Sequence, residues 1–323
     1  MQPQQQIRLS GLLQAQGPDG SDSAEALYWA SPEVQSFFEK LDGYALLVVL
    51  GNNLGLLIYA SSGGSSGRAG DVRWGVLLTL MLAAAQYLLR LLRADVCRKH
   101  RHSLAVGNRL VRHILHMTAA LQQSFNVMGA KFLQEEHSLV AVLARRLGFG
   151  PLMQLQISFN FSLPVRTAVL LQPLCAAAAA VVGYNAPQML GAVPGMQQLA
   201  GQLCMLLSAW HELVLFVLTL GDTPPPGHDS SCRGPLVFNQ LLVFINLLCS
   251  CWLPLFVAHM VELNAKMCFW QARGMAVAAA PSLLLPLPQQ RLLSHLLVGL
   301  LVPTLLWSLA ELLAPVLAAR VDA

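Results

Sequence analysis

The sequence predicts an all-α protein of the polytopic transmembrane class: a bundle of six spans with an amphipathic helix at the cytoplasmic interface. Of the 323 residues, 55% are hydrophobic and only 11% are charged, with a mean hydropathy of +0.55. In a soluble domain about a quarter of the residues are charged, so the few charges of this chain cannot cover a surface exposed to water. The apolar residues also form runs near the roughly 20 residues that a helix needs to cross a bilayer.

Polar segments separate the apolar runs and set the expected domain organisation. The expected segments are a polar N-terminal segment with an interfacial helix (1–40), a first transmembrane hairpin (41–92), a basic cytoplasmic connection (93–164), a four-span bundle (165–317) and a C-terminal tail (318–323). The predicted spans are 41–60, 73–92, 165–183, 197–220, 236–260 and 293–317. The stretch 269–290 is short for a span and is interrupted by prolines, which favours an interfacial or re-entrant segment. If it crosses, the chain has seven spans.

The distribution of cations predicts how the chain is oriented. Ten of the 20 Lys and Arg residues lie between Arg90 and Arg146. Cations near the ends of spans are retained on the cytoplasmic side, so the connection 93–164 is expected there. With six spans both termini are cytoplasmic as well, and residues 261–292 lie on the opposite side.

The basic connection contains an amphipathic pattern from Val106 onward. Apolar residues recur at helical spacing on one face, and the opposite face carries Arg109, Arg112, His113 and His116. Such a helix is typical of a segment in the membrane interface, where each basic residue near anionic lipid contributes about 1 kcal/mol. The other interpretation is a helix packed on the ends of the spans with its basic face in water.

Three ionisable residues fall inside predicted spans, where a charge costs about 2.5 kcal/mol or more and usually faces a cavity or a partner. His211 and Glu212 lie in the fourth span, and Glu311 lies at a similar depth in the sixth. A carboxylate beside an imidazole can exchange protons, which favours a proton or ion pathway; a structural hydrogen-bonded contact and a metal site are the alternatives. The metalloprotease pattern HExxH is not met, because Leu215 stands where the second His is required. No metal site is therefore assigned.

A second polar group is expected at the outer edge of the bundle. His259 and Glu262 are three residues apart and share a helix face, and His295 opens the final span at a similar level. Because this level is close to the interface, a solvated helix end is the favoured interpretation.

The first span carries Gly51 and Gly55 at GxxxG spacing, with Asn52 and Asn53 between them. Small residues four apart let helices approach closely, and amides can form hydrogen bonds across the contact. Packing within the monomer is favoured over dimerisation.

Recognisable catalytic sequences are missing: we find no Walker A sequence, Rossmann glycine pattern, nucleophile elbow or CxxC pair. No catalytic residue or cofactor is therefore predicted, and an intramembrane enzyme ranks third among the functional classes. The seven cysteines fall mostly in or beside apolar runs, which favours small buried side chains over a disulfide framework.

Two functional hypotheses follow. The first is a small transporter or channel-like protein with a proton or ion pathway. The alternative is a non-transporting sensor, anchor or assembly subunit that acts through the basic connection. The expected partners are the lipid bilayer, with anionic lipid at the cytoplasmic face, and a second copy or another membrane protein; nucleic acid is not expected because the basic cluster belongs to membrane segments.

Overall fold

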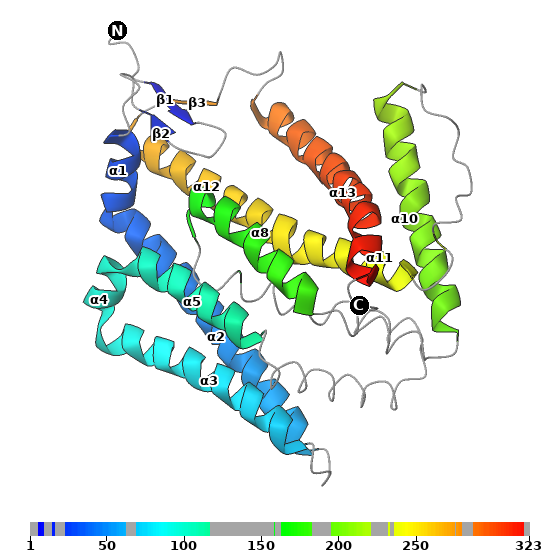
Figure 1. The fold of residues 1–323 in the computed structure, drawn as a ribbon. Coiled ribbons are helices and arrows are strands. Elements are labelled where there is room, and N and C mark those ends of the chain that lie inside the picture. Colours follow the sequence, from blue (N-terminus) through cyan, green and yellow to red (C-terminus); the bar gives the residue numbers. More distant parts are fainter. Residues whose placement is uncertain are drawn as a thin grey trace. The chain divides into compact units, whose positions relative to one another are not determined.

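In the residues that it describes, the computed structural model of the chain is helical apart from one small sheet (Figure 1). The residues that it describes are 6–9, 15–16, 23–62, 69–116, 158, 163–182, 195–220, 232, 236–274, 276–279 and 287–319. The chain divides into two compact units that alternate along the sequence: unit 1 comprises 1–128, 155–175 and 253–283, and unit 2 comprises 129–154, 176–252 and 284–323. Each unit is described by itself.

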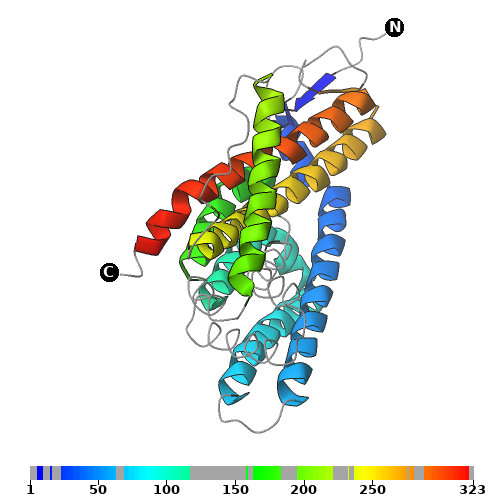
Figure 2. The same cartoon turned by 90° about the vertical axis from the view of Figure 1, so that its right-hand side faces the viewer.

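Unit 1 is built around a long helical hairpin. Its helices are α1 (Ser23–Ala30), α2 (Pro32–Ser62), α3 (Ala69–Leu92), α4 (Ala94–Lys99), α5 (Arg101–His116), the first part of α8 (Val165–Val182) and α12 (Leu253–Ala272). Pro32 opens α2, a position where its missing N–H removes no helical hydrogen bond. In both views α2 and α3 lie side by side (Figures 1 and 2). Leu46 on α2, Ala105 on α5 and Ala168 on α8 belong to one buried apolar cluster.

Unit 2 contains α10 (Met196–Leu218), α11 (Leu236–Asn246), a π-helical segment η3 (Leu247–Trp252) and α13 (Leu287–Ala319). The π-helical segment has a local cause, because Pro254 has no N–H to donate to the carbonyl of Ser250 four residues earlier. The core of the unit is apolar, and α11 packs against both α10 and α13.

The sheet joins the N-terminal strands to the segment after α12. Strands β1 (Gln6–Leu9), β2 (Ala15–Gln16) and β3 (Ala276–Ala279) are ordered β2-β1-β3. β1 pairs with β3 in parallel, with Gln6 opposite Ala276. The stretch 269–290, predicted to be interfacial or re-entrant, therefore contains the end of a helix and a paired strand.

Each of the six predicted spans overlaps a helix, although α8 ends at Val182 and α10 at Leu218, and three helical stretches are long and apolar enough to cross a membrane. These are Met196–Leu218, Leu236–Ala272 and Val298–Val316, and two shorter apolar stretches occur at Leu77–Leu92 and Val165–Ala177. The transmembrane class is supported, whereas the count of six spans is not confirmed.

Two ion pairs connect the N-terminal helices to the end of α12 and the residue that follows it. Glu25 on α1 pairs with Lys266 on α12 at 2.8 Å, and Glu33 on α2 pairs with Arg273 at 3.3 Å. The prediction had placed the N-terminal segment and residues 261–292 on opposite sides of the membrane. Partners in an ion pair share one side of a membrane, which would require an even number of crossings between Glu33 and Lys266 where six spans give five. The sidedness of each segment stays a prediction.

Candidate functional site

Three helices of unit 2 turn polar side chains toward one another. On α10, Ser208 and His211 lie on the same face because they are three residues apart. On α13, Thr304, Ser308 and Glu311 share a face in the same way. Together with one side chain from α11 they form what we call the polar seam, which consists of Ser208, His211, Gln240, Thr304, Ser308 and Glu311.

Two hydrogen bonds connect the helices across the seam. His211 Nε2 and Ser308 Oγ are 3.4 Å apart, and Gln240 Nε2 donates to Glu311 Oε1 at 3.3 Å. The Ser308 hydroxyl also lies 3.3 Å from the carbonyl oxygen of Thr304. A hydroxyl has one proton, so it can donate to Thr304 while accepting from His211, or donate to His211 itself. The two arrangements require opposite protonation of His211 Nε2, and switching between them moves a proton.

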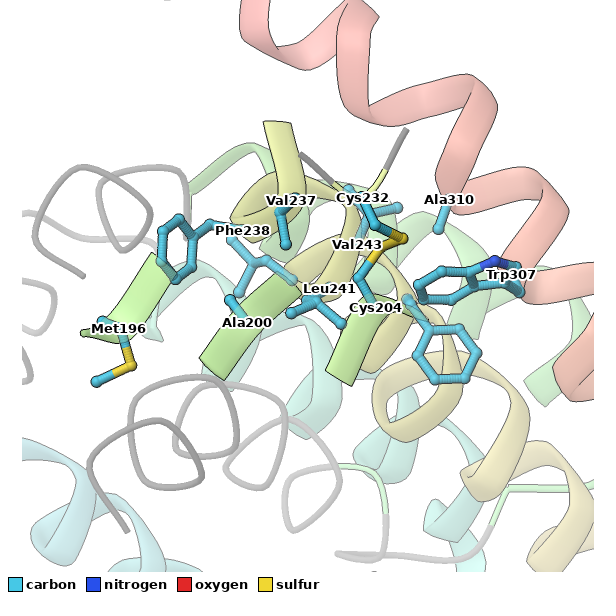
Figure 3. Close-up of a cluster of buried hydrophobic side chains, with 12 residues drawn as sticks. Met196, Ala200, Cys204, Cys232, Val237, Phe238, Leu241, Val243, Trp307 and Ala310 are labelled. Atoms are coloured by element: carbon cyan, nitrogen blue, oxygen red, sulfur yellow. A yellow bond between two sulfur atoms is a disulfide. The ribbon is translucent and has the colours of Figure 1, made fainter. Parts of the chain in front are cut away.

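The seam borders an apolar core that contains a disulfide bond (Figure 3). Cys204 on α10 is bonded to Cys232, 28 residues later in the sequence. Cys232 lies close to α10: its carbonyl oxygen is 3.4 Å from the position that a Cβ on Gly201 would take, and its Sγ is 3.6 Å from Ser208 Oγ. The prediction of cysteines without a disulfide is wrong for this pair, because the spacing of the two residues gives no sign that Cys232 returns to the side of α10.

The predicted intramembrane trio is brought together only in part. His211 and Glu311 both contact the seam, through Ser308 and Gln240. Glu212 is half-buried and forms no hydrogen bond or ion pair with another described residue. The reason is helical geometry, since adjacent residues point about 100° apart and His211 already occupies the seam face.

Unit 1 contains a buried ion cluster formed by Glu25, Glu262 and Lys266. Lys266 Nζ lies 2.8 Å from both carboxylate oxygens of Glu25 and 2.7 Å from Glu262, and its side chain is fully buried. Glu262 also accepts a hydrogen bond of 2.7 Å from the backbone N–H of Val165. The ring of Tyr28 is 5.1 Å from Lys266 Nζ, within range of a cation–π interaction.

The solvated helix end predicted at this level is wrong for Glu262, whose exposed fraction is 3%. The cause is the length of α12, which continues to Ala272 and packs against α1 through Tyr28 and Phe269. His259 is half-buried and also has an interaction partner. His295 lies within α13, but its side chain is outside the described part.

The ion cluster changes the pKa of the neighbouring Tyr28. Burial raises the pKa of its phenol, and the nearby charges of Glu262 and Glu25 raise it further. The phenol therefore stays neutral beside the carboxylates.

The start of the basic connection is tied to α2 by two ion pairs. Arg98 Nε lies 2.9 Å from Glu39, and Arg101 Nε lies 2.9 Å from Asp42, whose side chain is 2% exposed. These pairs place Arg98 and Arg101 beside the first turns of α2.

The basic face of α5 points inward. The exposed fractions are 3% for Arg109, 5% for Arg112 and 4% for His113, whereas Leu110 and Val111 are about two-fifths exposed. Both predicted arrangements placed this basic face at headgroups or in water, and both are wrong for these three residues. His116 ends α5, and its side chain lies outside the described part.

Polar neighbours hold the two buried guanidinium groups of α5. Arg109 donates to Gln172 Oε1 at 2.9 Å and to the carbonyl oxygen of Ser158. Arg112 donates to Asn108 Oδ1 at 2.9 Å and to Gln86 Oε1 at 3.1 Å. Burial lowers the pKa of both arginines to about 10.

His113 lies beside these arginines, and its Nδ1 is 2.7 Å from the carbonyl oxygen of Arg109. The carbonyl can only accept, so Nδ1 carries the proton. Burial is the largest effect and lowers the pKa of His113. The hydrogen bond to the Arg109 carbonyl raises this pKa, and the positive charge of Arg109, the smallest of the three effects, lowers it.

The GxxxG pattern of α2 does not form a close helix contact in this chain. Gly51 and Gly55 are exposed, and a Cβ on either would meet no atom within 4 Å. Asn52 is exposed too, but Asn53 is buried and accepts a hydrogen bond of 2.8 Å from Thr79 on α3. The contact between α2 and α3 therefore uses one amide and neither glycine.

No protein-family model matches the sequence, and comparisons with curated proteins and with solved structures find no match. Within the described residues no group of three or more His, Cys, Asp or Glu side chains is placed to hold a metal ion. The function is therefore argued from the geometry of the chain's own side chains.

Proposed function

We propose that the protein is a small multi-pass membrane transporter or channel-like protein in which the polar seam carries protons. One observation carries this proposal: each of the three stretches that are long enough to cross a membrane contributes a polar side chain to the seam. They contribute His211, Gln240 and Glu311. His211 is hydrogen-bonded to Ser308 of α13, and Gln240 of α11 is hydrogen-bonded to Glu311 of α13.

The chemistry of the seam supports proton movement. Polar groups inside a membrane are costly, and they mark pathways or structural contacts. Ser308 supplies the hydroxyl between His211 and the backbone, and Glu311 lies one turn further along the same face of α13. A carboxylate, an imidazole and a switching hydroxyl are the groups that proton relays use.

The orientation of the chain is part of the proposal. We infer that the N-terminal segment, the cations between Arg93 and Arg101, and residues 261–273 are cytoplasmic, because ion pairs join the three. Crossings by α10 and by the helix 236–272 satisfy the even count. Residues 219–235 then face the outside, and a final crossing by α13 places the C-terminus outside too.

The disulfide bond supports the same orientation independently. Disulfides are rare in the cytosol and common in secreted and luminal segments. Cys232 belongs to the connection 219–235, which the six-span topology had made cytoplasmic and which the proposed orientation makes external.

Reporter fusions at the two ends of the chain test the orientation. A reporter active only in the cytoplasm is expected to be active at the N-terminus and silent at the C-terminus, and a reporter active only outside is expected to show the reverse. Activity of the cytoplasmic reporter at both ends would contradict the proposed orientation.

Proton flux into vesicles tests the seam. The purified chain is reconstituted into liposomes that contain a pH-sensitive dye, and a potassium diffusion potential drives protons inward. We expect flux with the wild-type chain and its loss in Glu311→Gln and His211→Asn, because each substitution removes a titratable group.

Glu212→Gln is the matched comparison, since it removes the same charge one residue from His211. The polar seam predicts that flux is retained in this variant, whereas the trio suggested by the sequence predicts its loss. Wild-type vesicles without flux would refute the proton pathway and favour the non-transporting anchor. Flux that persists in both seam variants would refute the role of the seam.

A further inference from the structure

The buried basic face of α5 carries two positive charges without a described negative partner. It belongs to unit 1 and shares no residue with the polar seam. Arg109 and Arg112 are both at least 95% buried. Their hydrogen bonds go to amide, carbonyl and carboxamide oxygens, and neither forms an ion pair with a described carboxylate. Among the described residues, these two buried positive charges thus have neutral partners only, although buried charges are normally paired.

Donors on the same face also lack acceptors. Among the described residues, Arg109 Nε and Asn108 Nδ2 are buried without a hydrogen-bond partner. Residues 108, 109, 112 and 113 lie on one face of α5 because of their helical spacing. The unpaired donors and the unpaired charges therefore occur in one place.

We propose that this face binds a phosphate group. Guanidinium groups match the geometry of phosphate oxygens and bind them through paired N–H donors. A phosphate monoester or inorganic phosphate carries a charge of about −1.5 to −2 at neutral pH, which balances two guanidinium groups. The phosphate oxygens would also accept from Arg109 Nε and Asn108 Nδ2.

The phosphate group has two sources, the headgroup of a phospholipid and free phosphate. Leu110 and Val111 are exposed on the other side of α5, which brings an apolar surface close to the basic face. Either source presents the same oxygens to the arginines. The inference rests on residues of unit 1 alone, so it is tested independently of the proton pathway in unit 2.

Thermal unfolding of the full chain in an uncharged detergent tests the proposal. The first probe is sodium phosphate against sodium chloride at equal ionic strength. The second is short-chain phosphatidic acid against diacylglycerol of the same chain length. A ligand at a hundredfold excess over its Kd is expected to raise the Tm by about 5 °C, and the probe that does so identifies the source.

Substitutions assign the effect to the site. Arg109→Gln and Arg112→Gln are expected to weaken binding by about ten- to a hundredfold, because each removes charged hydrogen bonds. Arg93→Gln is the control, since it removes the same charge from an exposed position. Asn108→Ala keeps both arginines and removes one donor, and it provides a milder variant if the arginine variants fail to fold.

A shift in the wild type that is lost in the α5 variants and kept in Arg93→Gln supports the site. Absence of a shift with both probes, or an equal shift in the α5 variants, would overturn it. Native mass spectrometry of the wild-type chain gives a reading that does not depend on any variant. It is expected to show one phosphate or one phosphatidic acid per chain, and a spectrum with neither would also overturn the proposal.

Discussion

Replacing Lys266 by methionine tests the ion cluster most directly. The lysine side chain is fully buried between the carboxylates of Glu25 and Glu262, at 2.8 and 2.7 Å. Methionine has a similar length and fills the space, so the change removes the charge and leaves the packing nearly intact. Glu262, which is 3% exposed, would then keep only the N–H of Val165 as a partner.

The expected magnitude follows from the burial of the charge that remains. Removing one partner of a buried ion pair costs about 3–5 kcal/mol, because the other charge is left without compensation. For a chain of this size, each kcal/mol lowers the Tm by about 2–4 °C, so a decrease near 10 °C is expected. In the double variant Lys266→Met/Glu262→Met the buried carboxylate is removed as well, and only Glu25, whose side chain is 20% exposed, keeps its charge, so most of the lost stability is expected to return.

Unfolding in detergent micelles measures the effect, with Lys40→Met as the control because Lys40 is exposed on α2 of the same unit. The single, double and Glu262→Met variants together give the coupling energy between the two residues. If the single variant loses less than about 1 kcal/mol, or if the double variant is no more stable than the single one, the cluster does not stabilise unit 1 by charge pairing.

Three further predictions concern other contacts. Cys232→Ser opens a loop of 28 residues and is expected to cost about 3.6 kcal/mol by the chain-entropy estimate, seen as a lower Tm that reductant no longer changes. The lowered pKa of His113 means that the unfolded chain binds a proton first, so stability is expected to fall as pH drops below about 6.5. His113→Gln should flatten this pH dependence of the Tm and the exposed His100→Gln should not; equal profiles in the two variants would contradict the assignment. Asn53→Ala is expected to cost about 1 kcal/mol in unfolding titrations through the lost bond to α3, against no change for the exposed Asn52→Ala.

The sequence was informative where a single helix decides the outcome. Run lengths predicted the helices. That His211 and Glu311 meet stays a prediction, because they bond to different residues, Ser308 and Gln240. It was not informative where pairing crosses long distances. Nothing in the local pattern around Glu262 or Cys232 indicates a partner 97 or 28 residues away, so the bond to Val165 and the disulfide were both missed.

The sequence also does not predict which face of an amphipathic helix points into the protein. Helix α5 shows the physical reason. Helical spacing separates Arg109 and Arg112 from Leu110 and Val111, but it does not say which face points inward. In water the apolar face is buried because that removes apolar area from the solvent. In apolar surroundings that gain disappears, and the charged face points inward where amide and carbonyl groups can satisfy it. The exposed Leu110 and Val111 are therefore the pattern expected if this side of unit 1 faces an apolar environment.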